Sequence, residues 1–422
     1  MDNANPNSKI IIAIHCFDSS GTVRRAFNMA NQLTTKGFSV EIMASHGILK
    51  APLFGFNNGV KIVSVNENKR TFTEFDAAQF SKYVSNGDAS SKNIYSVSDS
   101  SVDKKPNLLT ELYSFITKFT YLPYKANFKR YHHIYREYYR CAAPDAVIAF
   151  GHRRFERVLA GTKGLNCKLI DSEANSFEAL FPKDKRAYRY YSRILSKADC
   201  IVVQTQNEKK IFEKEYNNVR VINNSLKEDL PKPYIGTRKK VIVNFCRISP
   251  QKNLPLLIKA FSMFHEHYPE YILVIYGITA ELEEVLLKEK LINNIYNQGL
   301  SNCIKILSAI SNIHNNVLDS AMFVSSSNHE GLSNSMLEAM AIGLPCICTD
   351  CLGGGTREVM VDHENGLIVP MNDEEAMFHA MKEFADNPEL AEKCSKNAIK
   401  IREKLSVEKI TNQWIEIIEN CY

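Results

Sequence analysis

The sequence predicts an α/β protein with two successive domains, each built around a mainly parallel sheet. Its 422 residues suffice for two or three domains, and 45% hydrophobic with 23% charged residues is the composition of a folded globular chain. Patterns of buried strands and amphipathic helices alternate in two runs, separated by a short Pro-containing linker at residues 229–236. Ligands of such sheets bind at the carboxyl ends of the strands, so a cleft between the two domains is the expected site.

Charge and cysteine usage exclude several classes of protein. Lys and Arg (52) minus Asp and Glu (47) leave +5, too mild over this length to indicate a nucleic-acid partner. No apolar run approaches the roughly 18–20 residues of a membrane helix, and residues 1–6 lack the pattern of a signal peptide. Several cysteines lie inside apolar strand-like runs, where a thiol acts as a small hydrophobe, so a reducing, cytoplasmic protein is expected.

The N-terminal half begins with a strand–helix–strand unit. A buried-strand pattern at 9–14 is followed by a loop at 18–22, an amphipathic helix at 23–36 and a second strand at 38–44. Further strands are expected at 61–65, 146–150, 168–170 and 200–203. We expect this domain to span residues 1–232 and to bind the acceptor of the reaction inferred below.

The same alternation restarts after the linker. Strands are predicted at 240–245, 271–276, 304–306, 322–324 and 345–348, and a helix at 254–267. The last residues, 407–422, have apolar side chains at helical spacing. We therefore expect a second domain at 236–403 and a closing helix within 404–422 that packs back on the first domain.

Residues 86–140 form an aromatic and basic insertion in the first domain. Residues 111–139 contain ten Phe or Tyr. Two interpretations stay open: a helix that packs on the first domain, or an interfacial helix that contacts anionic lipid at the inner membrane face. The side chains expected to touch the membrane in the second case are Tyr121, Tyr124, Lys125, Phe128, Lys129, Arg130, Tyr131, Tyr135 and Arg136.

Residues 329–345 hold the strongest chemical motif. Ser333 or Asn334 is placed to cap a helix, and Glu338 lies about one turn inside that helix, with Glu330 before it. A helix start directs backbone N–H groups and a positive dipole end at one point, which suits a phosphate. A solvated capping loop would have the same sequence, so the motif needs support from elsewhere.

That support comes from the loop after the first strand of the second half. Arg247 and Lys252 lie there, at a carboxyl strand end, where two cations would neutralise a diphosphate. Downstream, a Gly-rich loop at 353–355 follows another strand. The three-cysteine group at 346–351 is the alternative of a metal site, which we disfavour because its first two members alternate within a strand and no second cluster matches them.

In order over residues 240–375, these motifs resemble the retaining glycosyltransferases of family 4 (glycosyl transferases group 1), of the type that builds bacterial surface polysaccharides. The matching features are the Arg-x4-Lys-Asn loop, the Glu-x7-Glu motif, Gly-Leu-Pro at 343–345, the Gly-rich loop and Asn-Gly-Leu-Ile-Val-Pro at 365–370. The resemblance implies the GT-B fold, two Rossmann-like domains facing each other across a cleft.

The resemblance also implies roles for individual residues. Arg247 and Lys252 would hold the diphosphate of a nucleotide-sugar, Glu338 the ribose hydroxyls, and Glu330 would face the donor sugar. The backbone at Leu332, Ser333 and Asn334 would contact sugar and phosphate, and Gly21 would let a first-domain loop approach the donor. Arg247, Lys252 and Glu330 are thus the expected catalytic residues.

The acceptor side is less defined. Glu173 and Asn175 follow a first-domain strand in a Ser-Glu-x-Asn loop that resembles that subset of the family. Glu173 would orient an acceptor hydroxyl or merely cap the helix that follows it. His15 and His152 each follow a strand, and each is either an acceptor-side residue or a structural histidine.

The expected function is transfer of a hexose or N-acetylhexosamine from a nucleotide-sugar, for which a UDP-sugar is the expected donor. The expected acceptor is a growing cell-surface glycan, such as a capsule or lipopolysaccharide, either lipid-linked or free. No Asp-x-Asp occurs in the chain, and the family works without a bound metal, so no cofactor is expected. The alternatives are a GT-B phosphorylase or hydrolase and a non-catalytic subunit that binds a nucleotide-sugar.

Overall fold

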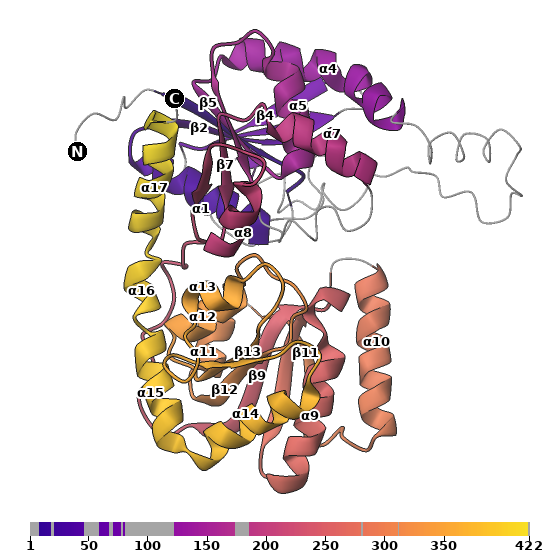
Figure 1. The fold of residues 1–422 in the computed structure, drawn as a ribbon, viewed down its shortest axis with the longest axis vertical. Coiled ribbons are helices and arrows are strands. Elements are labelled where there is room, and N and C mark those ends of the chain that lie inside the picture. The colour runs from indigo at the N-terminus through magenta and orange to yellow at the C-terminus, as the bar shows by residue number, and fades with distance from the viewer. Residues whose placement is uncertain are drawn as a thin grey trace, which may run out of the picture.

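The computed structural model describes residues 8–17, 21–45, 59–66, 71–76, 79–80, 122–173, 185–279, 282–310 and 312–420. Figure 1 shows two α/β domains, with the C-terminal helices running along one side of both. The predicted fold class is therefore confirmed.

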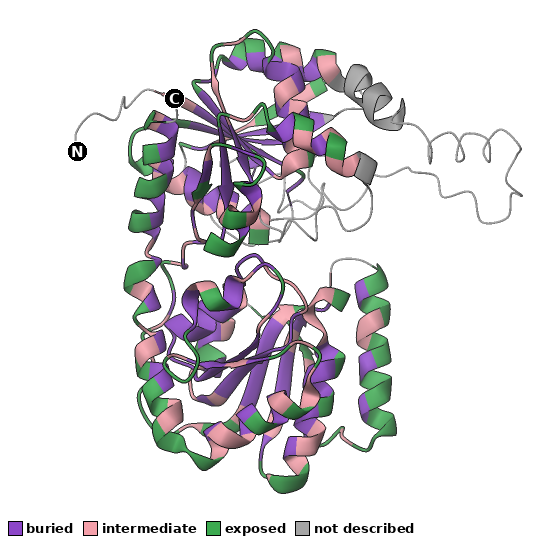
Figure 2. Cartoon of the chain, in the orientation of Figure 1, coloured by how far each residue is buried: buried purple, intermediate pink, exposed green. Residues whose placement is uncertain are grey.

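The N-terminal domain has an eight-stranded sheet in the order β4-β3-β2-β1-β5-β6-β7-β8, in which only the β3–β4 pair is antiparallel. Its strands are β1 (Lys9–Ile14), β2 (Ser39–Ala44), β3 (Lys61–Asn66), β4 (Thr71–Phe75), β5 (Ala146–Phe150), β6 (Lys168–Ser172), β7 (Cys200–Val203) and β8 (Val219–Val221). Its helices include α1 (Gly21–Thr35), α4 (Leu122–Ala142), α5 (His152–Thr162), α7 (Lys185–Leu195) and α8 (Gln206–Phe212). Helices cover both sides of the sheet, so the central strands are buried, as their purple colour in Figure 2 shows, and their residues are mainly apolar.

The C-terminal domain has a parallel six-stranded sheet in the order β11-β10-β9-β12-β13-β14. Its strands are β9 (Lys239–Arg247), β10 (Ile272–Ile278), β11 (Ile304–Ser308), β12 (Ser320–Ser325), β13 (Cys346–Thr349) and β14 (Leu367–Val369). Its helical segments are η1 (Pro250–Lys252), α9 (Leu254–His267), α10 (Leu282–Asn297), α11 (Ile313–Val317), α12 (Asn334–Ala341), α13 (Gly355–Val359), α14 (Glu374–Asp386) and α15 (Pro388–Ala398).

Both sheets reverse their strand order beside their first strand. In the first domain β1 lies between β2 and β5, and in the second β9 lies between β10 and β12. Loops that leave the carboxyl ends of such neighbours run to opposite sides of the sheet and leave a crevice between them, the usual ligand site of open α/β sheets. The loops after β9 and β12 contain four of the predicted donor residues, Lys252, Glu330, Leu332 and Ser333, and Arg247 is the last residue of β9.

The C-terminal half of α4 packs inside the first domain. Tyr135, Tyr138 and Tyr139 are buried, and the Tyr138 hydroxyl donates to Glu41 at 2.7 Å. Gly161 of α5 allows this packing, since a Cβ there would lie 2.5 Å from the Tyr139 ring. The interfacial interpretation was therefore wrong for Tyr135, which is not available to lipid. The side chains of residues 121–131 lie outside the described residues, and membrane contact through them stays a prediction.

The chain returns to the first domain through α16 (Ile401–Lys404) and α17 (Val407–Asn420). Figure 1 shows α17 beside α1. The Lys168 ammonium donates to the carbonyls of Ile418 at 2.8 Å and Glu419 at 2.6 Å, and so satisfies acceptors that the end of a helix leaves exposed.

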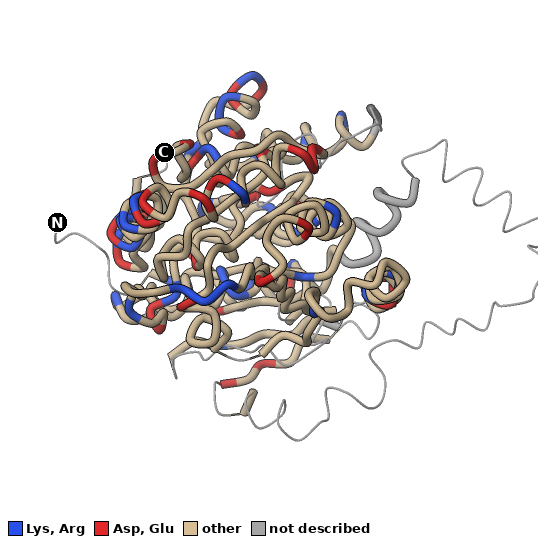
Figure 3. Tube along the Cα trace, turned by 90° about the horizontal axis from the view of Figure 1, so that it is seen from below, with Lys and Arg blue, Asp and Glu red and all other residues tan. Residues whose placement is uncertain are grey.

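Two further surface properties bear on function. Among the described residues, no helix combines the length and the hydrophobicity needed to cross a membrane. Positive and negative residues are interspersed along the trace in Figure 3, in keeping with the mild net charge of +5.

Candidate active site

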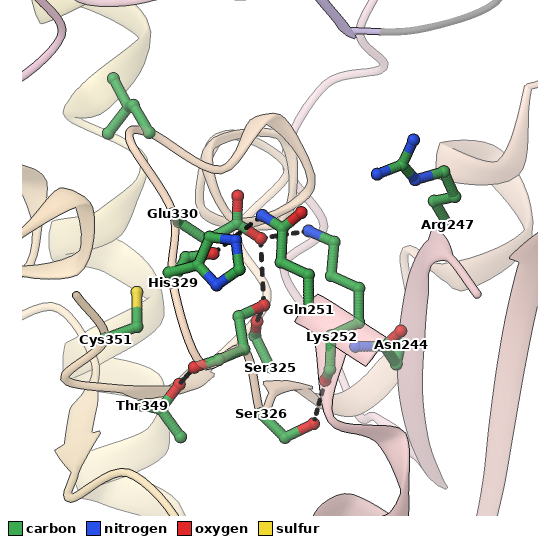
Figure 4. Close-up of polar contacts among 12 residues, drawn as sticks. Asn244, Arg247, Gln251, Lys252, Ser325, Ser326, His329, Glu330, Thr349 and Cys351 are labelled. Atoms are coloured by element: carbon green, nitrogen blue, oxygen red, sulfur yellow. Dashed lines mark hydrogen bonds and ion pairs between the residues drawn. The ribbon is translucent and has the colours of Figure 1, made fainter. Parts of the chain in front are cut away.

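Lys252 and Glu330 form an ion pair at the centre of the second domain's crevice. Lys252 ends η1 just after β9, Glu330 follows β12, and Figure 4 shows their side chains directed at one another. The Ser327 hydroxyl donates to the same Glu330 oxygen at 3.0 Å. Burial lowers the pKa of Lys252, but the neighbouring Glu330 raises it more, so the ammonium has a pKa above its usual value and is charged at neutral pH.

Hydrogen bonds between the two loops hold this pair in place. Gln251 donates through its side-chain amide to the His329 carbonyl at 2.8 Å, and the Ser326 hydroxyl donates to the Lys252 carbonyl at 2.8 Å. The two loops therefore form one unit at the carboxyl ends of β9 and β12.

Arg247 lies at the same end of β9 but apart from Lys252. Its Nε is 3.2 Å from Glu284 Oε1 of α10, and half of its side chain (51%) is exposed. Figure 4 shows it separated from the Lys252–Glu330 pair. Each of the two predicted phosphate ligands thus has its own carboxylate partner.

Glu338 of α12 is buried between two domains. Its Oε2 lies 2.9 Å from His314 Nε2 of α11, and its Oε1 lies 2.7 Å from Arg24 Nη2 of α1. Burial raises the pKa of this carboxyl, but Arg24 and His314 lower it more, so its pKa lies below the ordinary value. The motif that revealed Glu338 gave no sign of His314 or Arg24 as its partners.

A second contact joins the α12 loop to the first domain. The Asn224 amide donates to the Leu332 carbonyl and to Asn334 Oδ1, both at 3.0 Å. A Cβ at Gly21 would lie 2.9 Å from Asn334 Nδ2, so the start of α1 comes close to the Asn334 side chain. Ser333 precedes α12 as its N-cap residue, with no hydrogen bond from its own side chain.

The Gly-rich loop closes the crevice from the opposite side. Gly353 and Gly354 have φ of 98° and 74°, which favours glycine, and a Cβ on Gly355 would lie 1.9 Å from the Gly331 carbonyl oxygen. The Thr205 hydroxyl of the first domain donates to the Gly353 carbonyl at 2.9 Å. This loop therefore packs on both the Glu330 loop and the first domain.

The structure brings together two of the predicted acceptor-side residues. Glu173 Oε1 accepts the backbone N–H of His152 at 2.7 Å and lies 3.0 Å from the His152 ring Nδ1. Glu173 thus holds the first residue of α5, after Gly151 with φ of 95°. Burial raises the pKa of Glu173, but His152 lowers it more, so this carboxyl has a lowered pKa. His15 is exposed after β1, and Asn175 lies outside the described residues.

Two ionisable residues beneath this pair, Asp171 and Arg25, were not among the predicted site residues. Asp171 is fully buried, and its pKa is well above the ordinary value because of burial first and the nearby Glu173 second. Arg25 stacks over the Phe150 ring at 4.5 Å and donates to the Ser172 hydroxyl at 2.5 Å. The position of Asp171 within an otherwise apolar strand was the one feature of the sequence that could have indicated a functional residue here.

The cysteine group is part of the hydrophobic core. Cys346 and Cys348 are buried in β13, and burial raises the pKa of both thiols. Among the described residues, no group of three or more His, Cys, Asp or Glu side chains is arranged to hold a metal ion.

The second domain, which contains this crevice, is similar to known glycosyltransferases. Residues 227–401 match the family model "Glycosyl transferases group 1". An uncharacterized glycosyltransferase of Methanocaldococcus jannaschii is 34% identical over 198 residues, 42% of this chain and 45% of that protein. The Campylobacter jejuni N-acetylgalactosamine-N,N'-diacetylbacillosaminyl-diphospho-undecaprenol 4-alpha-N-acetylgalactosaminyltransferase is 31% identical over 170 residues, 40% of this chain and 44% of that protein. These matches thus span less than half of either relative.

Solved structures match over nearly the whole chain. The Anabaena protein HepE, in complex with UDP and glucose, superposes with a TM-score of 0.70 over 98% of this chain and 100% of that chain, at 14% identity. At that identity the likeness shows the fold alone, which is GT-B. The family model and the relatives together show that residues of the second domain are similar to those of glycosyltransferases.

Proposed function

We propose that this protein transfers a hexose or N-acetylhexosamine from a UDP-sugar to a growing surface glycan, with retention of anomeric configuration. The Lys252–Glu330 ion pair at the topological switch point carries the proposal, because it sets a charged ammonium where α/β folds bind nucleotides. The name of the Campylobacter relative supports an N-acetylhexosamine and a lipid-linked glycan, and the HepE complex supports UDP and a hexose.

Departure of the nucleoside diphosphate is the step that this site assists. Negative charge develops on the leaving phosphate as the bond to the sugar breaks, and cations oriented beforehand stabilise that charge. Lys252 is held by Glu330, which also accepts a hydrogen bond from Ser327, and Arg247 is held by Glu284, so neither cation has to reorganise during the reaction. The backbone N–H groups at the start of α12 add positive potential.

Glu338 is the proposed ribose ligand. Its lowered pKa keeps it ionised at neutral pH, so it accepts hydrogen bonds and suits two vicinal hydroxyl donors. His314, at 2.9 Å from one oxygen, fixes the orientation of this carboxylate.

The acceptor is proposed to bind at His152 and Glu173 of the first domain. Their 3.0 Å contact fixes the imidazole, whose ring also contacts Tyr191 at a centroid distance of 4.5 Å. We expect Glu173→Gln to raise the KM for the acceptor and to leave the slow hydrolysis of donor without acceptor unchanged. An equal decrease in the rates of transfer and of donor hydrolysis would show that Glu173 does not act in the acceptor site.

Turnover of a panel of UDP- and GDP-sugars, with and without acceptor, tests the proposed function. Acceptor-dependent release of UDP supports a transferase, and equal release without acceptor indicates a hydrolase. Sugar phosphate formed only with inorganic phosphate indicates a phosphorylase. UDP binding without any turnover would favour the non-catalytic subunit. Thermal stabilisation identifies the donor, since a ligand at 100 times its Kd stabilises by about 2.7 kcal/mol.

A further inference from the structure

We propose that Glu284 of α10 is a positioning residue that fixes the Arg247 guanidinium for the diphosphate of the donor. The inference rests on the proposed function, in which Arg247 binds that diphosphate. The contact that carries it is the 3.2 Å ion pair between Arg247 Nε and Glu284 Oε1.

Packing does not explain why a glutamate occupies this position. The buried residues of α10 are Glu284, Leu291 and Ile295, which recur at helical spacing along one face. Only 8% of the Glu284 side chain is exposed. A carboxylate on an otherwise apolar face destabilises the fold unless it is paired, so a leucine would suit the core better. Glu284 is therefore less favourable for the stability of the fold than a leucine would be at this position.

The atom that Glu284 contacts matters for phosphate binding. A guanidinium carries five N–H donors in a rigid plane, and its two terminal nitrogens form the fork that bonds a phosphate in bidentate fashion. Glu284 contacts Nε, on the other side of the group. Because Arg247 is half exposed, this contact restricts its rotamers and reduces the entropy lost when a phosphate binds.

The backbone brings α10 to this position by a fixed register. Arg247 pairs with Ile278 at the last rung of the β9–β10 ladder, and the Ile248 N–H donates to the Ile278 carbonyl at 2.8 Å. Gly277 leaves room for Ile248, since a Cβ there would lie 2.3 Å from Ile248 Cδ1. The chain leaves β10 beside Arg247 and starts α10 a few residues later, so Glu284 and Arg247 are held on adjoining elements.

Calorimetric titration with UDP tests the inference on the full chain. We expect Glu284→Gln to weaken UDP binding about tenfold, as loss of a coupled charged contact does, while Glu283→Gln, an exposed neighbour on the same helix, changes it less than about twofold. In an Arg247→Ala background, Glu284→Gln should have no further effect. Glu284→Leu, which suits the apolar face, should fold at least as stably and still bind UDP about tenfold more weakly.

Any result that differs from these expectations contradicts the inference. Unchanged or tighter UDP binding by Glu284→Gln or Glu284→Leu would show that Glu284 does not orient Arg247 productively. An equal loss in the Arg247→Ala background would show a general structural effect. If the unmodified protein bound no UDP, the proposed UDP donor would fail and this inference with it, whereas the preceding outcomes overturn the inference alone.

Discussion

Arg24 Nη2 of α1 lies 2.7 Å from Glu338 Oε1 of α12, so an ion pair crosses the cleft between the two domains. Only 18% of the Arg24 side chain and 8% of the Glu338 side chain are exposed. The carboxylate proposed to bind the donor ribose is therefore also a point of contact between the domains. If Glu338 binds the donor as proposed, donor binding would be coupled through this residue to the contact between the two domains.

We expect Arg24→Gln to destabilise the protein. The change leaves the buried Glu338 carboxylate without its arginine partner, which should lower the free energy of unfolding by about 1–3 kcal/mol, as measured by urea denaturation. Arg357→Gln is the matched control, because its pair with Asp350 is exposed and should change stability by less than about 1 kcal/mol. Equal stability losses in the two variants would mean that the cross-domain pair contributes no more than a surface pair.

The second prediction concerns the donor cations. Lys252→Ala and Arg247→Ala should each lower turnover by about 10²-fold or more, because the leaving diphosphate loses a counter-charge oriented before reaction. Lys259→Ala controls for general loss of charge, since Lys259 pairs with Glu374 on the outer surface of the second domain and is largely exposed. Near-normal turnover in both site variants, with the control also unaffected, would remove these cations from the mechanism.

The sequence predicted the fold more fully than the site. The alternation of strands and helices along the chain follows from periodicity and short connections, and the helix expected at 254–267 is α9, with those bounds. The order of the strands within each sheet was not predicted. The edge strands β4, β8 and β14 were missed. Polar residues interrupt the apolar pattern of β4 and β8, and β14 is only three residues long.

Motif spacing located the donor residues but not their partners. Glu330 and Lys252 lie 78 positions apart and meet only because β9 and β12 are adjacent in the sheet. Glu284, His314 and Arg24 lie far along the chain from the carboxylates and cations they contact, and nothing in the local pattern marks them. Long-range pairing of single polar side chains depends on register and packing, which periodicity does not encode.

The third prediction concerns metal ions. Transfer activity should persist in excess EDTA and should not rise on addition of Mg²⁺ or Mn²⁺, because Lys252 and Arg247 are proposed to provide the positive charge that a bridging metal provides elsewhere. The measurement is UDP release in chelated buffer, with donor and acceptor both saturating. Loss of activity in EDTA that Mn²⁺ restores would show that the leaving phosphate needs a metal, and would overturn the proposed role of the two cations.

The last prediction follows from the buried Asp171. Its pKa is raised well above the ordinary value by burial and by Glu173, so the folded protein keeps a proton on it that the unfolded chain, with a pKa of about 3.9, releases. The folded state binds more protons than the unfolded state above that pH. By linkage, this residue therefore makes the protein less stable as pH rises from about 4 toward neutrality.

Asp171→Asn removes this titration and keeps the shape of the side chain. Relative to the unmodified protein, the variant should be more stable at pH 7 than at pH 4.5, as followed by thermal unfolding at the two pH values. Asp229→Asn changes an exposed residue in the linker and serves as the control. The difference in stability between this variant and the unmodified protein should be the same at pH 4.5 and at pH 7. A relative stability of Asp171→Asn that falls between pH 4.5 and 7 would mean that Asp171 is ionised in the folded protein. Arg25, whose pKa burial lowers to about 10, would then balance two carboxylates instead of Glu173 alone.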